Sequence, residues 1–138
     1  MQRYNKLRNN LYSADLFYGK IELKRTHGFS CFFIVEHTFD AEFIKNQAIQ
    51  LLLAGCQDFH FYGKAESNWH FGVDEANIFL HSKSASETDV LISGWSILEE
   101  FADALNDVLS LRPFVPHDFY LIYDDEEIYR NVLKRLEK

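Results

Sequence analysis

Short runs of apolar residues alternate with segments of helical periodicity from residue 30 onward. After the run SCFFIVE, the segment DAEFIKNQAIQLLLAGC places five apolar residues on one helical face, and Gly55 is positioned to end that helix. Those five residues are Phe43, Ile44, Ala48, Leu51 and Leu52. A run followed by a helical segment occurs three more times, so the sequence predicts four consecutive βα units.

This alternation predicts an α/β fold with three layers, in which helices cover both faces of a mainly parallel sheet. Runs that are apolar at nearly every position fit such strands, because both faces of a strand in a covered sheet are buried. At 138 residues, the chain fits a single domain, 1–138. We expect four parallel strands, near residues 30–36, 58–63, 89–94 and 118–123.

The N-terminal segment has a different pattern. In KIELKR, Ile21 and Leu23 alternate with charged residues, which predicts a half-exposed antiparallel strand at the edge of the sheet, near 20–25. Residues 4–18 are expected to form a short helix and a loop that pack on this edge.

The charge of the chain is divided unevenly along its length. Of the 14 Lys and Arg residues, six lie in the basic N-terminal arm 1–25, together with two of the 21 acidic residues. Residues 26–138 therefore carry a net charge of −11, within a total of −7. Because such an acidic body repels phosphate backbones and attracts basic proteins, we expect a basic protein partner and no nucleic acid.

No apolar run reaches the roughly 18 residues that span a bilayer, and the N-terminal MQRYNKLRNN lacks the apolar core of a secretory signal. We therefore expect a cytoplasmic protein with no membrane partner. Cys31 and Cys56 are 25 residues apart and have no CxxC spacing, so we expect two buried free thiols and no disulfide.

In an open α/β sheet, ligands bind beyond the carboxyl ends of the strands. The segments EHTFD, YGKAESNWH, GWSILE and YDDEE follow the four predicted strands, so their side chains should meet at one edge. We expect a partner-binding surface there, with aromatic residues as anchors and acidic residues as steering charges. The candidate residues are Glu36, His37, Trp69, Trp95, Asp124, Asp125 and Glu126.

A structural role explains many of the same residues. Asp40 is placed to cap the helix that follows it. Ser96 with Glu99 matches a capping box. Asp124 with Glu127 nearly matches one. Both tryptophans can also fill the core, where the ring occupies volume and its N–H finds a carbonyl group.

The sequence contains no catalytic, metal-binding or nucleotide-binding motif. Its six histidines have no HxxxH or HxH spacing, and its glycines form neither GxGxxG nor GxxxxGK, so we expect no metal, nucleotide or other cofactor. A small hydrolase-like or ligand-binding enzyme is the alternative, with a general acid–base group drawn from Glu36, His37, Asp124 and Asp125. Adjacent strand residues point to opposite faces, which disfavours cooperation between Glu36 and His37. A carboxylate with a strongly raised pKa would favour the enzyme, whereas exposed aromatic residues on an acidic surface would favour binding.

The motifs FFIVE, LLLAGC, FYGK, NW, VDEAN, SGW and EE, spread over residues 29–123, resemble those of a small family of bacterial α/β domains of unknown function. The matching positions are Gly55, Cys56, Gly63, Trp69, Asp74, Ala76, Asn77, Trp95 and Glu99. The resemblance implies an α/β domain and no particular activity.

The chain is small, acidic and rich in aromatic residues, and in these general features it also resembles the immunity proteins of bacterial toxin systems, including those of contact-dependent growth inhibition. This likeness rests on no shared motif. This likeness implies a non-enzymatic protein that neutralises a basic toxin by direct binding, and an acidic surface would speed such an encounter. A regulatory protein-interaction module is a further alternative.

Overall fold

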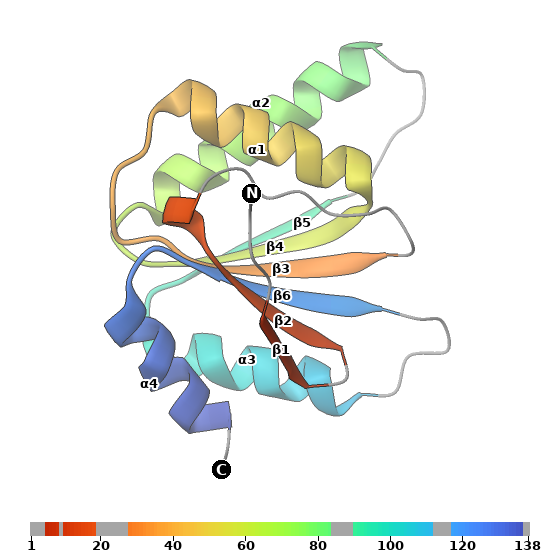
Figure 1. Cartoon of the computed structure of the whole chain (residues 1–138). Helices are drawn as coiled ribbons and strands as arrows, with labels where there is room; N and C mark the ends of the chain where they lie inside the picture. Colours follow the sequence, from red (N-terminus) through yellow and green to blue (C-terminus); the bar gives the residue numbers. More distant parts are fainter. Residues whose placement is uncertain (1–4, 9, 19–27, 84–89, 112–116, 137–138) are drawn as a thin grey trace.

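A six-stranded sheet forms the middle layer of the computed structural model, which describes residues 5–8, 10–18, 28–83, 90–111 and 117–136 (Figure 1). The strands follow one another across the sheet in the order β1-β2-β6-β3-β4-β5. Neighbours from β2 to β5 are parallel, and β1 is antiparallel to β2. The strands are β1 (Asn5–Arg8), β2 (Leu11–Asp15), β3 (Phe29–Ile34), β4 (Cys56–Tyr62), β5 (Leu91–Trp95) and β6 (Asp118–Tyr123).

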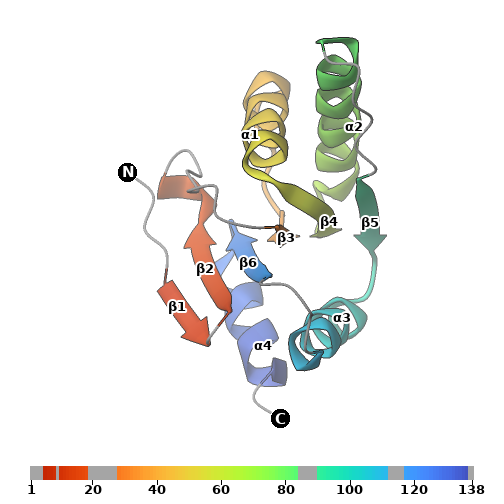
Figure 2. The ribbon, with the colours of Figure 1, turned by 90° about the vertical axis from the view of Figure 1, so that its right-hand side faces the viewer.

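Helices cover both faces of this sheet (Figure 2). The helices α1 (Ala41–Ala54) and α2 (Glu66–Lys83) lie on one face, and α3 (Leu98–Ser110) and α4 (Glu126–Leu136) lie on the other. The predicted three-layer α/β fold is therefore confirmed, with β3, β4, β5 and β6 as the four predicted parallel strands. None of the described helices is long and apolar enough to cross a membrane.

The N-terminal segment forms a β-hairpin, so the short helix and loop expected at 4–18 are wrong for its described part. A single 3-10 turn, η1 (Leu16–Tyr18), follows the hairpin strands β1 and β2. Leu11 and Ala14 of β2 are buried on opposite faces of the sheet, and this packing outweighs the helical spacing of the apolar residues. The antiparallel edge strand is β1, and the edge strand predicted near 20–25 lies outside the described residues.

The central strand β3 fills both halves of the core. Cys31 and Phe33 pack with residues of α1 and α2, whereas Phe32 and Ile34 pack with residues of α3 and α4. All four side chains are fully buried. Successive strand residues point to opposite faces, so a strand covered on both sides needs an unbroken apolar run.

Both cysteines lie in the half of the core that α1 and α2 cover. Cys31 and Cys56 are buried, free thiols, as the sequence predicted. Burial raises the pKa of the Cys31 thiol well above its ordinary value, and the neighbouring Cys56 raises it further.

The helix ends confirm one predicted signal and contradict two others. Gly55 ends α1 in the left-handed conformation, with φ of 112°, and its N–H donates to carbonyl groups of the last turn. Asp40 precedes α1 as predicted, but its side chain forms no capping hydrogen bond. The N-cap of α3 is Ile97, so the predicted capping box of Ser96 and Glu99 is wrong, because it requires Ser96 at the N-cap itself.

Candidate functional site

The chain leaves the sheet on opposite sides after the neighbouring strands β3 and β6. From β3 it continues to α1 above the sheet in Figure 1, and from β6 it continues to α4 below the sheet. Open α/β sheets have their ligand crevice at such a switch point, beyond the carboxyl ends of the two strands. Since β2 is parallel to β6, η1 lies at this same end of the sheet.

The carboxylate of Asp124 fills this crevice. Its Oδ1 accepts a hydrogen bond from the backbone N–H of Glu36 and its Oδ2 accepts one from the N–H of His37, each at 2.8 Å. The Asp124 N–H donates to the carbonyl oxygen of Ile34 at 3.1 Å. Asp124 is only 5% exposed. Two backbone N–H groups that could hold an anionic ligand are therefore bound to the protein's own carboxylate.

Burial raises the pKa of Asp124, because desolvation disfavours its charged form. The backbone hydrogen bonds from Glu36 and His37 act in the opposite direction but do not cancel the rise. A raised pKa suits a general acid. Both carboxyl oxygens are nevertheless occupied by backbone donors, so the geometry offers neither of them to a substrate.

Glu36 joins the end of β3 to the end of β4. Its Oε2 accepts a hydrogen bond from the backbone N–H of Lys64 at 2.8 Å, and the N–H of Ala65 donates to the Val35 carbonyl oxygen at 2.9 Å. Gly63, with φ of 130°, makes this approach possible, because a Cβ there would collide with the Val35 carbonyl. The segments after β3, β4 and β6 are thus connected through Glu36 and Asp124.

The N-terminal hairpin adds an aromatic residue that sequence reasoning missed. Phe17, in η1, is 59% exposed, and its ring centroid lies 5.3 Å from that of His37 and 5.5 Å from that of Phe39. The Asp15 carboxylate accepts a hydrogen bond from the Phe17 N–H at 2.9 Å and so fixes the turn. The sequence LYSAD of β2 has no strict apolar–polar alternation, so the local pattern gave no signal for this position.

Asp125 and Glu126 lie at the start of α4, beside Asp124. Asp125 caps this helix, since its Oδ1 accepts a hydrogen bond from the Ile128 N–H at 3.0 Å, so the cap predicted at Asp124 is wrong. Glu126 is exposed and pairs with Arg130 at 2.8 Å. We use the name strand-end surface for the exposed and half-exposed residues Phe17, Glu36, His37, Phe39, Asp125 and Glu126.

The structure does not bring the two tryptophans to the strand-end surface. Trp69 is 1% exposed and packs in the core, with its ring centroid 4.9 Å from that of Phe33. Trp95 is half-buried on the other face of the sheet from Trp69, the face that α3 and α4 cover. Its Nε1 donates to His60 Nδ1 at 3.4 Å. Trp69 is therefore a core residue in place of the predicted partner contact, and Trp95 belongs to a different part of the surface.

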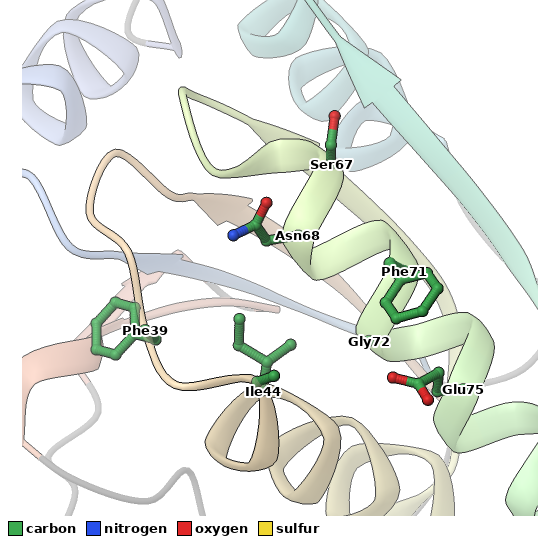
Figure 3. A pocket seen from close by; sticks show the side chains of 8 residues that line it. Phe39, Ile44, Ser67, Asn68, Phe71, Gly72 and Glu75 are labelled. Atoms are coloured by element: carbon green, nitrogen blue, oxygen red, sulfur yellow. The ribbon is translucent and has the colours of Figure 1, made fainter.

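A cleft of about 240 Å³ adjoins the strand-end surface at Phe39 (Figure 3). It lies between the start of α1 and the first turns of α2, with Ile44 on one side and Asn68 and Phe71 on the other. The two helices approach closely here, because a Cβ at Gly72 would collide with the Ile44 side chain. Phe39, Ile44 and Phe71 make the cleft largely apolar.

A second polar cluster, also missed from the sequence, lies within the sheet on the side of α3. Asp58 of β4 accepts hydrogen bonds from the hydroxyl of Ser30 and, at 2.7 Å, from His60 Nε2. Because Trp95 donates to His60 Nδ1, the His60 proton is assigned to Nε2. His117 Nε2 lies 2.7 Å from the Ser30 hydroxyl oxygen. Ser30 is buried, so this cluster does not present an exposed nucleophile.

No known protein family matches the sequence of this chain, and no curated protein matches it either.

Proposed function

We propose that this chain is a non-enzymatic binding protein that neutralises a basic toxin by covering it with the strand-end surface. The closed switch-point crevice is the observation that carries the proposal. Asp124 holds the two backbone N–H groups that a ligand would otherwise use, with both of its oxygens at 2.8 Å. The backbone donors at the usual ligand position of an open α/β sheet are thereby hydrogen-bonded within the protein.

The residues around the filled crevice suit a protein partner. Phe17 offers an exposed aromatic ring supported by His37 and Phe39, and such rings act as anchors in interfaces. Asp125 and Glu126 add negative charge at the same end of the sheet, within a chain of net charge −7. Acidic residues at the rim speed the encounter with a basic partner, while aromatic anchors slow its release.

A general acid–base enzyme is the second candidate, and the raised pKa of Asp124 is the observation in its favour. Its geometry is less suitable, since both oxygens of Asp124 accept backbone hydrogen bonds. Glu36 also uses Oε2 to accept the Lys64 N–H. Both carboxylates hold loops through backbone hydrogen bonds, which is a sufficient structural role for them.

The test begins with capture of the partner by the immobilised chain at low salt, followed by purification of the protein identified. Association and dissociation rates are then measured at low and high ionic strength. We expect the association rate to fall with salt by roughly tenfold, while the dissociation rate changes little. Rescue of a toxin-expressing strain by the chain supplies the functional readout.

Two double variants then locate the surface. Glu126→Gln with Glu127→Gln removes two exposed charges at the start of α4, whereas Asp74→Asn with Asp107→Asn removes two exposed charges elsewhere. We expect the first to slow association about three- to tenfold and the control to change it less than about twofold. Equal effects would argue against the strand-end surface.

Turnover of a small molecule by the purified chain would contradict the proposal if the activity is lost in Glu36→Gln. This substitution keeps an oxygen that can accept the Lys64 N–H, so it removes the charge while preserving the hydrogen bond at 2.8 Å.

A further inference from the structure

The two edges of the sheet are built differently. The edge strand β1 has four residues, contains Lys6 with its positive charge, and shifts register between positions 6 and 8. The opposite edge strand, β5, has the uncharged sequence LISGW and pairs with β4 in an unbroken register. Short length, positive charge and irregular register protect an edge against pairing with another chain, and β5 has neither the charge nor the irregularity.

Among the described residues, the outer side of β5 is open and apolar. Leu91 is 62% exposed, Gly94 is exposed, and Ile97 just after the strand is 48% exposed. In the described part of the chain, β4 is the only strand that pairs with β5. A strand paired on one side only leaves backbone N–H and C=O groups facing outward, and these are satisfied best by another strand.

We propose that β5 pairs with β5 of a second copy of this chain, antiparallel, so that one sheet continues through a two-fold symmetric dimer. An isologous contact of this kind uses the same segment on both copies and closes without further growth. The proposal goes beyond the proposed function and does not depend on it.

The residues of β5 are complementary to themselves in one register. A two-fold axis at Ser93 places Leu91 opposite Trp95 of the second copy, on the face that carries α3. On the other face, Ile92 lies opposite Gly94 of the second copy, and the Glu66 side chain occupies the space beside Gly94 that a Cβ would take. Leu91 and Trp95 thus form apolar cross-strand pairs, whereas the Glu66 carboxylates beside the two Gly94 residues repel each other, which salt screens.

The absence of charge from β5 favours a second copy over a partner selected by charge. Both copies carry a net charge of −7, which opposes their association at low salt. Salt should therefore strengthen this dimer, whereas it should weaken the encounter with a basic partner at the strand-end surface. The sign of the salt effect separates the two contacts.

The first test is sedimentation of the full chain over concentrations of about 5 to 500 µM, because pairing of two short strands buries less than a standard interface and should be weak. We expect a reversible monomer–dimer equilibrium that shifts toward dimer in high salt. Leu91→Lys should weaken the dimer at least about tenfold by placing charge on the edge. Leu53→Lys is the matched control, because Leu53 is 54% exposed on α1. Circular dichroism confirms that both variants fold.

The second test fixes the register. With the axis at Ser93, Ser93→Cys brings the two new thiols within the 4.4–6.8 Å Cα separation, approximately, that a disulfide needs. Ser96→Cys places its two thiols about 20 Å apart along the strands, at roughly 3.4 Å per residue. Oxidation of the native chain should therefore link Ser93→Cys and leave Ser96→Cys unlinked, since Cys31 and Cys56 are buried.

Either of two results overturns the proposal. One is a monomer at every concentration and salt. The other is a dimer that Leu91→Lys does not weaken and that Ser93→Cys does not link, which would place the contact on another surface.

Discussion

Asp124 and Asp58 are two hydrogen-bonded aspartates, one beyond the end of a strand and one within a strand of the same sheet. Their surroundings shift their pKa values in opposite directions. Asp124 lies beyond the carboxyl end of β6 and accepts two backbone N–H groups from the loop after β3. Asp58 lies within β4 and accepts hydrogen bonds from two side chains, Ser30 and His60. Burial raises the pKa of Asp124. It acts in the same direction on Asp58, but the hydrogen bonds from His60 and Ser30 outweigh it and lower that pKa.

The difference shows what each carboxylate does. Side-chain donors can turn and adapt, so the Asp58 cluster supports the packing of β3 and β4 without defining the surface. Backbone donors cannot turn away, so Asp124 fixes the path of Glu36 and His37 and thereby shapes the strand-end surface. The Asp58 cluster therefore contributes to stability alone, whereas Asp124 contributes to stability and also shapes the proposed binding surface.

The largest expected effect is that of Asp124→Ala. This substitution leaves two buried N–H groups without an acceptor, so the free energy of unfolding should fall by about 2 to 5 kcal/mol. Urea unfolding measures the loss. Asp40→Ala is the control, because Asp40 is exposed at the same end of the sheet and forms no side-chain cap, and it should cost less than about 0.5 kcal/mol. A loss at Asp124 as small as that of the control would show that the Asp124 carboxylate does not hold the backbone of Glu36 and His37 in place.

Asp58→Asn should have a smaller effect, about 1 kcal/mol, because the amide keeps one acceptor oxygen and the Ser30 hydroxyl can rotate to accept from its NH₂ group. The same urea titration measures it. A loss larger than that of Asp124→Ala would mean that the side-chain cluster, and not the backbone contact, is the main polar support of the sheet.

The pH dependence of stability should have opposite signs at the two sites. The Asp58 carboxylate contributes stability that is present above its ordinary pKa of 3.8 and is lost as pH falls through its lower folded-state value. The contribution of Asp124 is present below 3.8 and is lost as pH rises through its raised folded-state value.

The free energy of unfolding, measured against pH for the parent chain and two variants, should reveal both contributions. Asp58→Asn should lose stability less steeply than the parent chain on acidification below 3.8. Asp124→Asn should gain stability more steeply than the parent chain as pH rises above 3.8. Parallel curves for the two variants would contradict the assigned shifts.

The smallest effect on stability is expected at the surface itself. Phe17→Ala should change the free energy of unfolding by less than about 0.5 kcal/mol, because its ring is 59% exposed. The same change should increase the rate of partner dissociation about tenfold if the ring is an anchor. Leu111→Ala, at another exposed apolar residue, should leave both quantities unchanged. Equal dissociation rates for the two variants would show that Phe17 makes no contact.

The fold could be predicted because the apolar runs of β3, β4, β5 and β6 clearly indicate strands, each followed by a helical segment. The meeting of Glu36, His37 and Asp124 could also be predicted, since carboxyl ends of parallel strands share an edge. The position of Phe17 could not, because β2 joins the sheet by pairing with β6, more than 100 residues away. Local periodicity carries no information about such a pairing.

The Asp58 cluster was missed, and the two tryptophans were assigned to the wrong part of the molecule, for related reasons. Ser30 and Asp58 are single polar residues within apolar strands, and only the register of β3 with β4 shows that they are neighbours. Trp69 follows a predicted strand in sequence, but it belongs to the inward face of α2. A residue's position after a strand predicts at which end of the sheet the residue lies. It does not predict whether the side chain points into the core or toward the surface.

Hydrogen–deuterium exchange of the chain, alone and bound to its captured partner, is the most direct test of the central claim that the strand-end surface is the binding site. We expect slower exchange in the complex at residues 16–18, 36–40 and 124–127, with little change at 90–95. Protection confined to 90–95 or to the helix faces, with the strand-end segments unchanged, would contradict it.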